Sequence, residues 1–333
     1  MSSDKIDISV KEVDYTKRQK FNGSSLTLNF KGKDLNCKIV NTLRRVACNN
    51  IPVYAFPREL IDIQQNTCVA FNNDMLRLRL SQLPLLSIDE NELYFLQEKY
   101  YKDINFADPS RPKHPSEKSI EAYVNFHNNS NAIKDVTTND MKIYIDGAEV
   151  KMYDKDYPYL LVRLRPNDSF KCHMKACLGI GEYDAIWNAS SDAFYDQLDE
   201  KQNEYAFTVE SNGQLAEYDI LIKSCKFIVK KMEDVEIEIN RKLQTKELSD
   251  GKKFRLTLDE DHTVGEILNY YIQNLTDTNF SGVSKPDHLI KNIKIKIVSK
   301  KTTIPVIKTA IADIISIYKH LEKQFTKLQG KKN

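Results

Sequence analysis

The sequence predicts an α+β fold of two related halves that pair pseudo-symmetrically, with a β-rich domain inserted in the first half. Both ends of the chain repeat one order of elements: a strand, a short amphipathic helix, further strands and a long helix. The tripeptide Leu-Thr-Leu opens both copies, at residues 26–28 and 256–258. Each long helix carries a narrow apolar seam, which must be buried against another helix. Two such halves would resemble a two-fold symmetric dimer within one chain.

The composition is that of a folded globular protein. The chain has 333 residues, of which 41% are apolar and 29% charged, and its net charge is +2. So small a charge predicts no strong attraction to nucleic acid or to a membrane. No signal peptide is recognised, and no apolar run approaches the roughly 20 residues of a membrane helix. The six cysteines form no C-x-x-C pair, so we expect reduced thiols inside a cell.

The first half begins with a strand and an amphipathic helix. Alternating apolar residues predict a strand over residues 26–30, and helical spacing follows at Leu35, Ile39, Leu43 and Val46. The helix should end before Pro52, because proline disfavours helical backbone in the residue before it.

The middle of the chain is rich in predicted strands. Asp146-Gly147 lies between apolar runs at residues 141–145 and 150–153, which predicts a β-hairpin. Residues 103–119 contain three prolines among charged residues, and we expect a surface loop there.

A long helix follows, with apolar residues at alternating steps of four and three. Its seam is predicted to contain Leu221, Cys225, Ile228 and Met232. The alternation of Val235, Ile237 and Ile239 also fits a strand, so the pattern leaves the end of this helix open.

The second half repeats the plan. Residues 254–258 and 293–297 alternate as strands, and Thr263 followed by Glu266 predicts a capping box at the start of a short helix. The last helix has the clearest periodicity in the chain. Its predicted seam contains Ile311, Ile314, Tyr318, Leu321 and Phe325.

These patterns predict four regions. Residues 1–53 and 203–242 form the first half, residues 54–202 the inserted domain, residues 243–253 a linker and residues 254–333 the second half. The linker reaches roughly 40 Å when extended, enough for pairing within the chain. Tethering of this kind raises the effective concentration to about the millimolar range.

At three candidate sites the sequence favours a structural role over a chemical one. Gly179-Ile180-Gly181 lacks the third glycine of a dinucleotide loop, and no helical pattern follows it. Cys172, His173 and Cys177 lack a fourth zinc ligand at suitable spacing. His262, after three acidic residues, suits a helix start better than an acid–base site. We therefore predict no catalytic residue, no cofactor and no metal.

Several stretches resemble the alpha family of RNA polymerase subunits. Residues 41–46 (NTLRRV), followed by residues 51–55 (IPVYA), are similar to a motif of the eukaryotic third-largest subunit. So are residues 73–85, 178–187 and 207–213. Residues 260–268 (EDHTVGEIL) and 280–286 are similar to motifs of the eleventh subunit, its smaller partner. The order of the motifs matches over nearly the whole chain.

The resemblance implies a non-catalytic subunit of a DNA-directed RNA polymerase. It implies that the two halves pair through their long helices into a platform for the two largest, catalytic subunits. Small polymerase subunits of the tenth and twelfth type are further implied partners. Stable DNA binding by the chain alone and membrane partners are not expected. The implied large-subunit contacts are Asn41, Thr42, Leu43, Arg44, Arg45, Trp187, His262 and Thr263.

The chain departs from the eukaryotic pattern in two respects. The eukaryotic large partner has a four-cysteine zinc loop where this chain has the proline-rich residues 103–119, so zinc is not expected. The two partners are separate chains in eukaryotes and fused here. Because fused forms occur in large nucleocytoplasmic DNA viruses, the resemblance implies a viral subunit in the virion and the host cytoplasm, with the nucleus as the alternative location.

Two other functions compete with this interpretation. A direct nucleic-acid-binding protein would use Arg44, Arg45 and the basic tail with Lys327, Lys331 and Lys332, and its binding would weaken steeply with salt. An enzyme with a Cys or His site would need a pocket that the sequence does not reveal.

Overall fold

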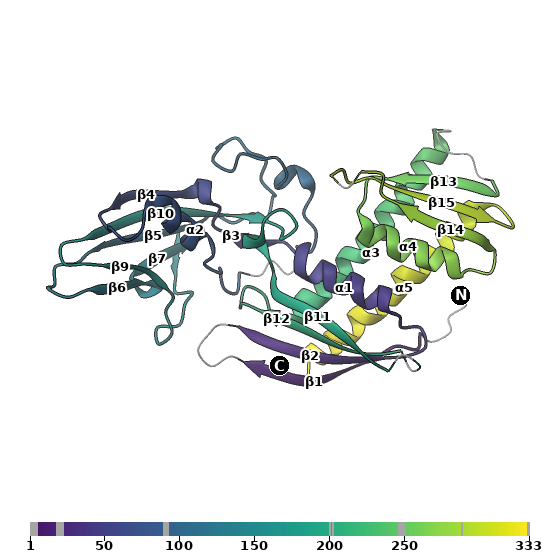
Figure 1. Cartoon of the computed structure of the whole chain (residues 1–333), viewed down its shortest axis with the longest axis horizontal. Coiled ribbons are helices and arrows are strands. Elements are labelled where there is room, and N and C mark those ends of the chain that lie inside the picture. Colours follow the sequence, from purple (N-terminus) through teal and green to yellow (C-terminus); the bar gives the residue numbers. More distant parts are fainter. Residues whose placement is uncertain are drawn as a thin grey trace.

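The computed structural model describes residues 6–17, 23–88, 93–199, 201, 203–245, 251–287 and 289–331. Part of the predicted linker, residues 246–250, lies outside the described residues, as does Lys332 of the basic tail. The fold is α+β with antiparallel sheets, as the sequence predicts. Figure 1 shows the two long helices crossing in the middle, with sheets on three sides of them.

The first half is a four-stranded sheet with two helices. The sheet order is β1–β2–β12–β11, with bounds β1 (Ser9–Lys17), β2 (Ser24–Lys31), β12 (Glu204–Ser211) and β11 (Ser190–Asp199). Its helices are α1 (Cys37–Asn49) and α3 (Glu217–Gln244). The alternating Leu26, Leu28 and Phe30 face the core and are fully buried. The side chain of Asn36 caps α1 by accepting hydrogen bonds from the amides of Lys38 and Ile39.

The second half repeats this arrangement. Its strands lie in the order β13–β15–β14, with bounds β13 (Lys253–Leu258), β15 (Ile293–Ser299) and β14 (Thr278–Ser284). Its helices are α4 (His262–Asn274) and α5 (Thr303–Gln329). The order matches β2–β12–β11 strand for strand, which explains the repeated sequence plan; β1 is an addition to the first half.

The middle of the chain forms its own β-rich layer, at the left of Figure 1. Five strands follow the order β3–β10–β5–β7–β8, β4 also pairs with β10, and β6 pairs with β9. The bounds of the strands are β3 (Val53–Ala55), β4 (Ile61–Asn66), β5 (Ile120–His127), β6 (Lys134–Thr137), β7 (Met141–Ile145), β8 (Ala148–Val150), β9 (Leu160–Leu164) and β10 (Ser169–Gly179). The helices are α2 (Asn73–Ser81) and the 3₁₀ turns η1 (Arg58–Leu60), η2 (Glu98–Tyr100), η3 (Thr138–Asp140) and η4 (Ala185–Trp187).

The buried apolar residues form two separate cores. One contains buried residues from both halves, and the other is built from residues between Tyr54 and Ile180. The predicted insert of residues 54–202 includes β11, yet β11 pairs with β12 in the sheet of the first half. We therefore propose that the inserted domain ends before β11, near residue 189.

The structure decides one open boundary and shifts one predicted strand. Residues 235–239 are helical, because α3 continues to Gln244 and turns Ile237 to solvent. In the β7–β8 hairpin, Asp146 and Gly147 both have positive φ, as a type I′ turn requires. The second strand begins directly after this turn, at Ala148, two residues earlier than predicted.

The two halves pair through α3 and α5. The helices run antiparallel: Gln329 Nε2 donates to Asp219 Oδ1 at 2.6 Å near one end, and Lys308 and Glu236 lie 3.9 Å apart toward the other. All nine residues predicted for the seam are at most 3% exposed. The buried Tyr318 hydroxyl of α5 donates to the carbonyl oxygen of Ile39 in α1 at 2.9 Å, which adds a polar contact between the halves.

The seam gives a direct test. Ile314 is fully buried, so the change Ile314→Asp should place an unpaired carboxylate in the core and lower the free energy of unfolding by about 4 kcal/mol or more. Ile237 on α3 is 62% exposed, and Ile237→Asp is the matched control. Thermal melting and gel filtration measure both. An unchanged melting temperature for Ile314→Asp would disprove the packing described here.

The proline-rich residues 103–119 are more than a surface loop. Phe106 is buried, and its ring centroid lies 5.3 Å from that of Trp187. Arg111 and Glu117 form an ion pair whose side chains are only 5% and 4% exposed, with Arg111 Nη1 donating to Glu117 Oε2 at 3.2 Å. A buried ion pair and an aromatic contact therefore fix this loop.

Removing one member of a buried ion pair leaves the other charge without compensation. Arg111→Met should therefore lower the free energy of unfolding by about 3–5 kcal/mol. The double variant Arg111→Met/Glu117→Leu should recover most of that loss, because no charge then remains buried. Chemical denaturation of the three proteins measures the effect. Equal stability of wild type and Arg111→Met would show that the pair contributes nothing.

Candidate interaction site

The fold brings α1 and the start of α4 together, although they lie more than 200 residues apart in the sequence. Arg45 Nε donates to Thr263 Oγ1 at 2.8 Å, and Arg45 Nη2 lies 3.6 Å from Asp261 Oδ2. About two turns earlier on α1, Lys38 Nζ pairs with Glu266 Oε2, one turn further along α4, at 3.1 Å. Two of the motifs that the sequence singles out thus form one continuous surface.

The predicted contact residues of α1 divide into two groups. Thr42 and Leu43 are buried, and they hold α1 in the core. Asn41, Arg44 and Arg45 are partly exposed, and Arg44 Nε donates to Asn41 Oδ1 at 3.1 Å. Only the second group offers side chains to a partner, together with the partly exposed His262 at the first position of α4.

The predicted capping box at Thr263 is wrong. The N-cap residue of α4 is Asp261, and Thr263 lies inside the first turn. The Thr263 hydroxyl accepts the hydrogen bond from Arg45, and the Glu266 carboxylate pairs with Lys38. Both side chains of the motif therefore contact α1 and do not cap their own helix.

Trp187 lies in the core, 1% exposed, and its indole donates to the carbonyl oxygen of Cys177 at 3.0 Å. A ring so deeply buried does not fit the contact with a large subunit that the resemblance implies for Trp187.

The Trp187 ring also explains the first glycine of Gly179-Ile180-Gly181, because a Cβ at Gly179 would lie 2.4 Å from the indole. A Cβ at Gly181 would lie 2.0 Å from the side chain of Asn188. These glycines permit close packing.

The cysteines and histidines do not assemble into a metal site in the described part of the chain, where no group of three or more His, Cys, Asp or Glu side chains could hold a metal ion. Cys172 and Cys177 are buried, and burial raises the pKa of the Cys172 thiol to about 12. His173 stacks on Tyr123 with ring centroids 4.3 Å apart. All six cysteines are free thiols.

Among the described helices, none is long and apolar enough to cross a membrane.

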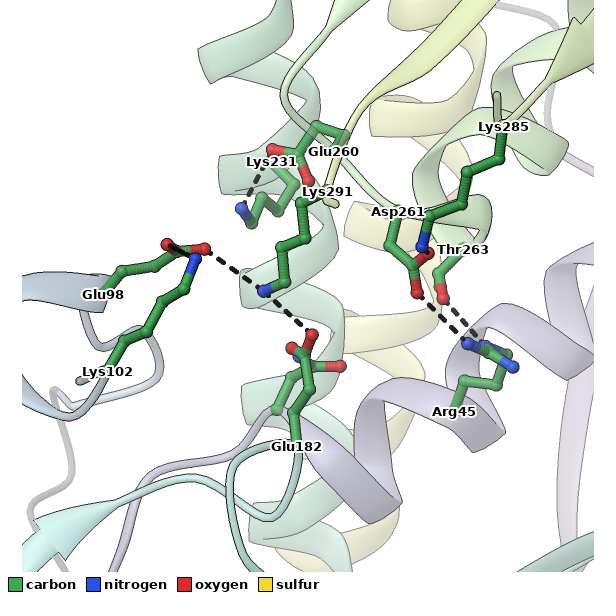
Figure 2. Close-up of polar contacts among 11 residues, drawn as sticks. Arg45, Glu98, Lys102, Glu182, Lys231, Glu260, Asp261, Thr263, Lys285 and Lys291 are labelled. Atoms are coloured by element: carbon green, nitrogen blue, oxygen red, sulfur yellow. Dashed lines mark hydrogen bonds and ion pairs between the residues drawn. The ribbon is translucent and has the colours of Figure 1, made fainter. Parts of the chain in front are cut away.

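A chain of ion pairs lies beside the α1–α4 contact (Figure 2). Lys291, just before β15, lies between two carboxylates of the middle region: Glu98 Oε1 at 3.2 Å and Glu182 Oε1 at 2.8 Å. Burial disfavours the charged form of Lys291, but the hydrogen bond and charge of Glu182 outweigh it and raise the pKa of Lys291. Lys291 therefore attaches the second half to the middle region.

A second set of ion pairs surrounds the residues before α4. Lys231 of α3 pairs with Glu260 at 2.9 Å, and Lys285 pairs with Asp261 at 2.9 Å. Burial raises the pKa of Glu260, and Lys231 offsets this only in part. Burial also acts to raise the pKa of Asp261, but hydrogen bonds from Lys285 and from the amide of His262 lower it overall.

A cavity of about 100 Å³ opens between these groups. Its apolar lining comes from Phe95 and from Phe227, Ile228 and Met232 of α3. Most of the ion-paired side chains of Figure 2 also line it, namely Arg45, Glu98, Glu182, Lys231, Glu260, Asp261 and Lys291. The cavity thus lies where α1, α3, the middle region and the second half meet.

Most of this network has no signal in the sequence. No pattern identifies Glu98, Lys231, Lys285 or Lys291, and Glu182 and Glu260 stand out only as members of the motifs at residues 178–187 and 260–268. Each pair joins residues from different elements, and a charged residue carries no local pattern that identifies a distant partner. The motifs at residues 41–46, 178–187 and 260–268 were the signals that this region matters.

The geometry defines the class of protein as one that pairs two related α+β halves through long helices. Comparison with known sequences agrees. Residues 29–232 and residues 254–324 each match the RNA polymerase Rpb3/Rpb11 dimerisation domain. A similar protein is a putative DNA-directed RNA polymerase subunit of Acanthamoeba polyphaga mimivirus, 28% identical over 320 residues and covering 89% of both chains. The chain belongs to the Rpb3/Rpb11 dimerisation domain family and contains two such domains.

The lowered pKa of Asp261 predicts a pH-dependent contribution to stability. A carboxylate whose pKa is lower when folded stabilises the fold above its unfolded pKa, and the contribution is lost as pH falls through the folded pKa. At about pH 7, Asp261→Asn should lower the free energy of unfolding by up to about 1 kcal/mol, because the site is partly exposed. The deficit should shrink as pH falls below the ordinary value of 3.8.

Urea denaturation at about pH 7 and at about pH 3 measures this difference. Asp196→Asn is the control, because Asp196 is exposed and no ion pair to another described residue is seen. A deficit for Asp261→Asn that is equal at both pH values would contradict an electrostatic role.

Proposed function

We propose that the chain is a non-catalytic assembly platform of a DNA-directed RNA polymerase, in which the two partners of an alpha-like heterodimer are fused. The observation that carries this proposal is the occurrence of two dimerisation domains in one chain, with the long helix of each packed on the other. Fusion fixes their ratio at one to one.

The partners in this proposal are the two largest polymerase subunits, with small subunits of the tenth and twelfth type. The surface made by Asn41, Arg44 and His262 supports it, because those side chains are accessible. Separately, the loop before Lys291 exposes Leu289 by 95% and Ile290 by 58%. Exposed apolar side chains and accessible hydrogen-bonding groups are both typical of a surface that a partner covers.

The organism of the relative supports a viral context for transcription. We propose the virion and the host cytoplasm as the sites of action. The alternative that uses Arg44, Arg45 and the tail for nucleic-acid binding gains no support, because Arg45 is engaged by Thr263 and Asp261.

Affinity purification of the tagged chain from its native source, followed by mass spectrometry, tests the platform. The two largest polymerase subunits should be recovered in roughly equal amounts, and Arg44→Glu should reduce their recovery without changing the melting temperature. Lys323→Glu, a reversal of an exposed charge on α5, is the control and should leave recovery unchanged. Purification of the wild type alone, or with unrelated partners, would contradict the proposal.

A further inference from the structure

The outer face of the β13–β15–β14 sheet is unusually basic. Residues whose side chains point inward on β13 and β15 are buried under α4 and α5, so the alternate residues point away from the helices. The outward positions of β13 and β15 include Lys253, Arg255, Lys294 and Lys296, all exposed. Arg255 and Lys296 are direct cross-strand partners. None of the four forms an ion pair with a residue that the structure describes.

An aromatic side chain completes this face on β14. Ser281 points inward, where its hydroxyl contacts Asn269 of α4 at 2.6 Å, so Phe280 and Gly282 point outward. Phe280 is 51% exposed. Its ring reaches across Gly282, where an added Cβ would lie 3.0 Å from Cζ. The phenyl ring therefore lies over Gly282, which has no side chain and whose cross-strand partner is Lys296.

The related sheet of the first half shows that the fold does not require this charge. There the outward positions of β2, β12 and β11 include Thr27, Thr208, Asp192 and Asp196, and Lys31 is paired with Glu204 at 3.0 Å. Phe194 of β11 is exposed by 43%, so an outward aromatic is present on both sheets. In the described residues of β2, β12 and β11 no outward cation is unpaired, and this distinguishes them from the matching strands β13, β15 and β14.

We propose that the outer face of the β13–β15–β14 sheet binds single-stranded nucleic acid. Cations that follow the backbone, together with an aromatic ring on which a base can stack, are the two elements of single-strand recognition by exposed sheets. An acidic protein segment fits less well, because the face offers only Phe280 and Val298 as apolar anchors and a protein interface needs an apolar centre.

This inference goes beyond the platform function and does not rest on it. It also qualifies the expectation that the chain alone does not bind DNA stably. Duplex DNA keeps its bases stacked, so it can use the cations but not Phe280. The inference concerns unpaired RNA or DNA, whose shared phosphates and base faces this surface would contact.

Fluorescence anisotropy with the full chain and labelled oligouridylate or oligothymidylate of about 12 nucleotides tests the inference. If four cations are engaged, a plot of the logarithm of the binding constant against the logarithm of the salt concentration should have a slope of about −3.

Phe280→Ala should weaken binding by about fivefold or more. Lys294→Gln/Lys296→Gln should make the slope shallower by about 1.4. A duplex of equal length should bind at least about fivefold more weakly, because it cannot stack on Phe280.

Two matched variants control for charge and for exposed aromatic area. Lys323→Gln/Lys327→Gln removes the same charge from the exposed face of α5, and Phe194→Ala removes the outward ring of the first sheet. Both should stay within about twofold of wild type. Circular dichroism should show unchanged melting for every variant, because all these side chains face solvent.

Three results would overturn the inference. The first is no binding of either single strand at about 50 mM salt. The second is an equal loss for the sheet and α5 lysine variants with no effect of Phe280→Ala, which would mean unspecific charge attraction. The third is tight binding of polyglutamate that Phe280→Ala does not weaken, which would assign the face to an acidic protein segment.

Discussion

The structure depends on burying the apolar seams of α3 and α5 against each other. Neither helix can be stable in water with its seam exposed, because each buried aliphatic or aromatic side chain contributes about 1.5–3 kcal/mol. Once the helices are paired, the remaining elements have fixed places. The sheet of each half packs directly on the long helices, and α1 and α4 each contact a long helix and the edge strand of their own sheet. The Tyr318 hydroxyl then reaches the backbone of α1, so the pairing also determines the contact between α1 and α4.

Most of the fold could be predicted because its signals are local. The alternation at Leu26 and Leu28 and the four-and-three spacing of the last helix each follow from one element with one buried face. The pairing of the halves can also be predicted from the sequence, because each long helix has a narrow apolar seam that must be buried against another helix. The end of the insert could not be predicted, because β11 has the same alternation as the strands before it and only its partner β12 assigns it to the first half.

The candidate site was predicted less completely, because its contacts join distant residues. Trp187 belongs to one of the motifs that resemble the alpha family. The position of its ring nevertheless depends on the absence of a side chain at Gly179 and on the contact with Phe106, in a loop distant in sequence. Thr263 has the residue type of an N-cap, but Arg45 engages its hydroxyl. In both cases a motif drew attention to the residue, and its tertiary partner determined what the side chain does in the fold.

The separation of α3 and α5 along the chain affects how the protein is made. Synthesis proceeds at about 5–20 residues per second, so roughly 4–17 s pass between completion of α3 and completion of α5. During that interval the side of α3 that packs on α5 has no intramolecular cover. Nascent chains on neighbouring ribosomes of one message could exchange their last helices, which would yield intertwined dimers with the same buried contacts. The short connection between the halves opposes this exchange, because it keeps the cognate helix at high local concentration as soon as it emerges.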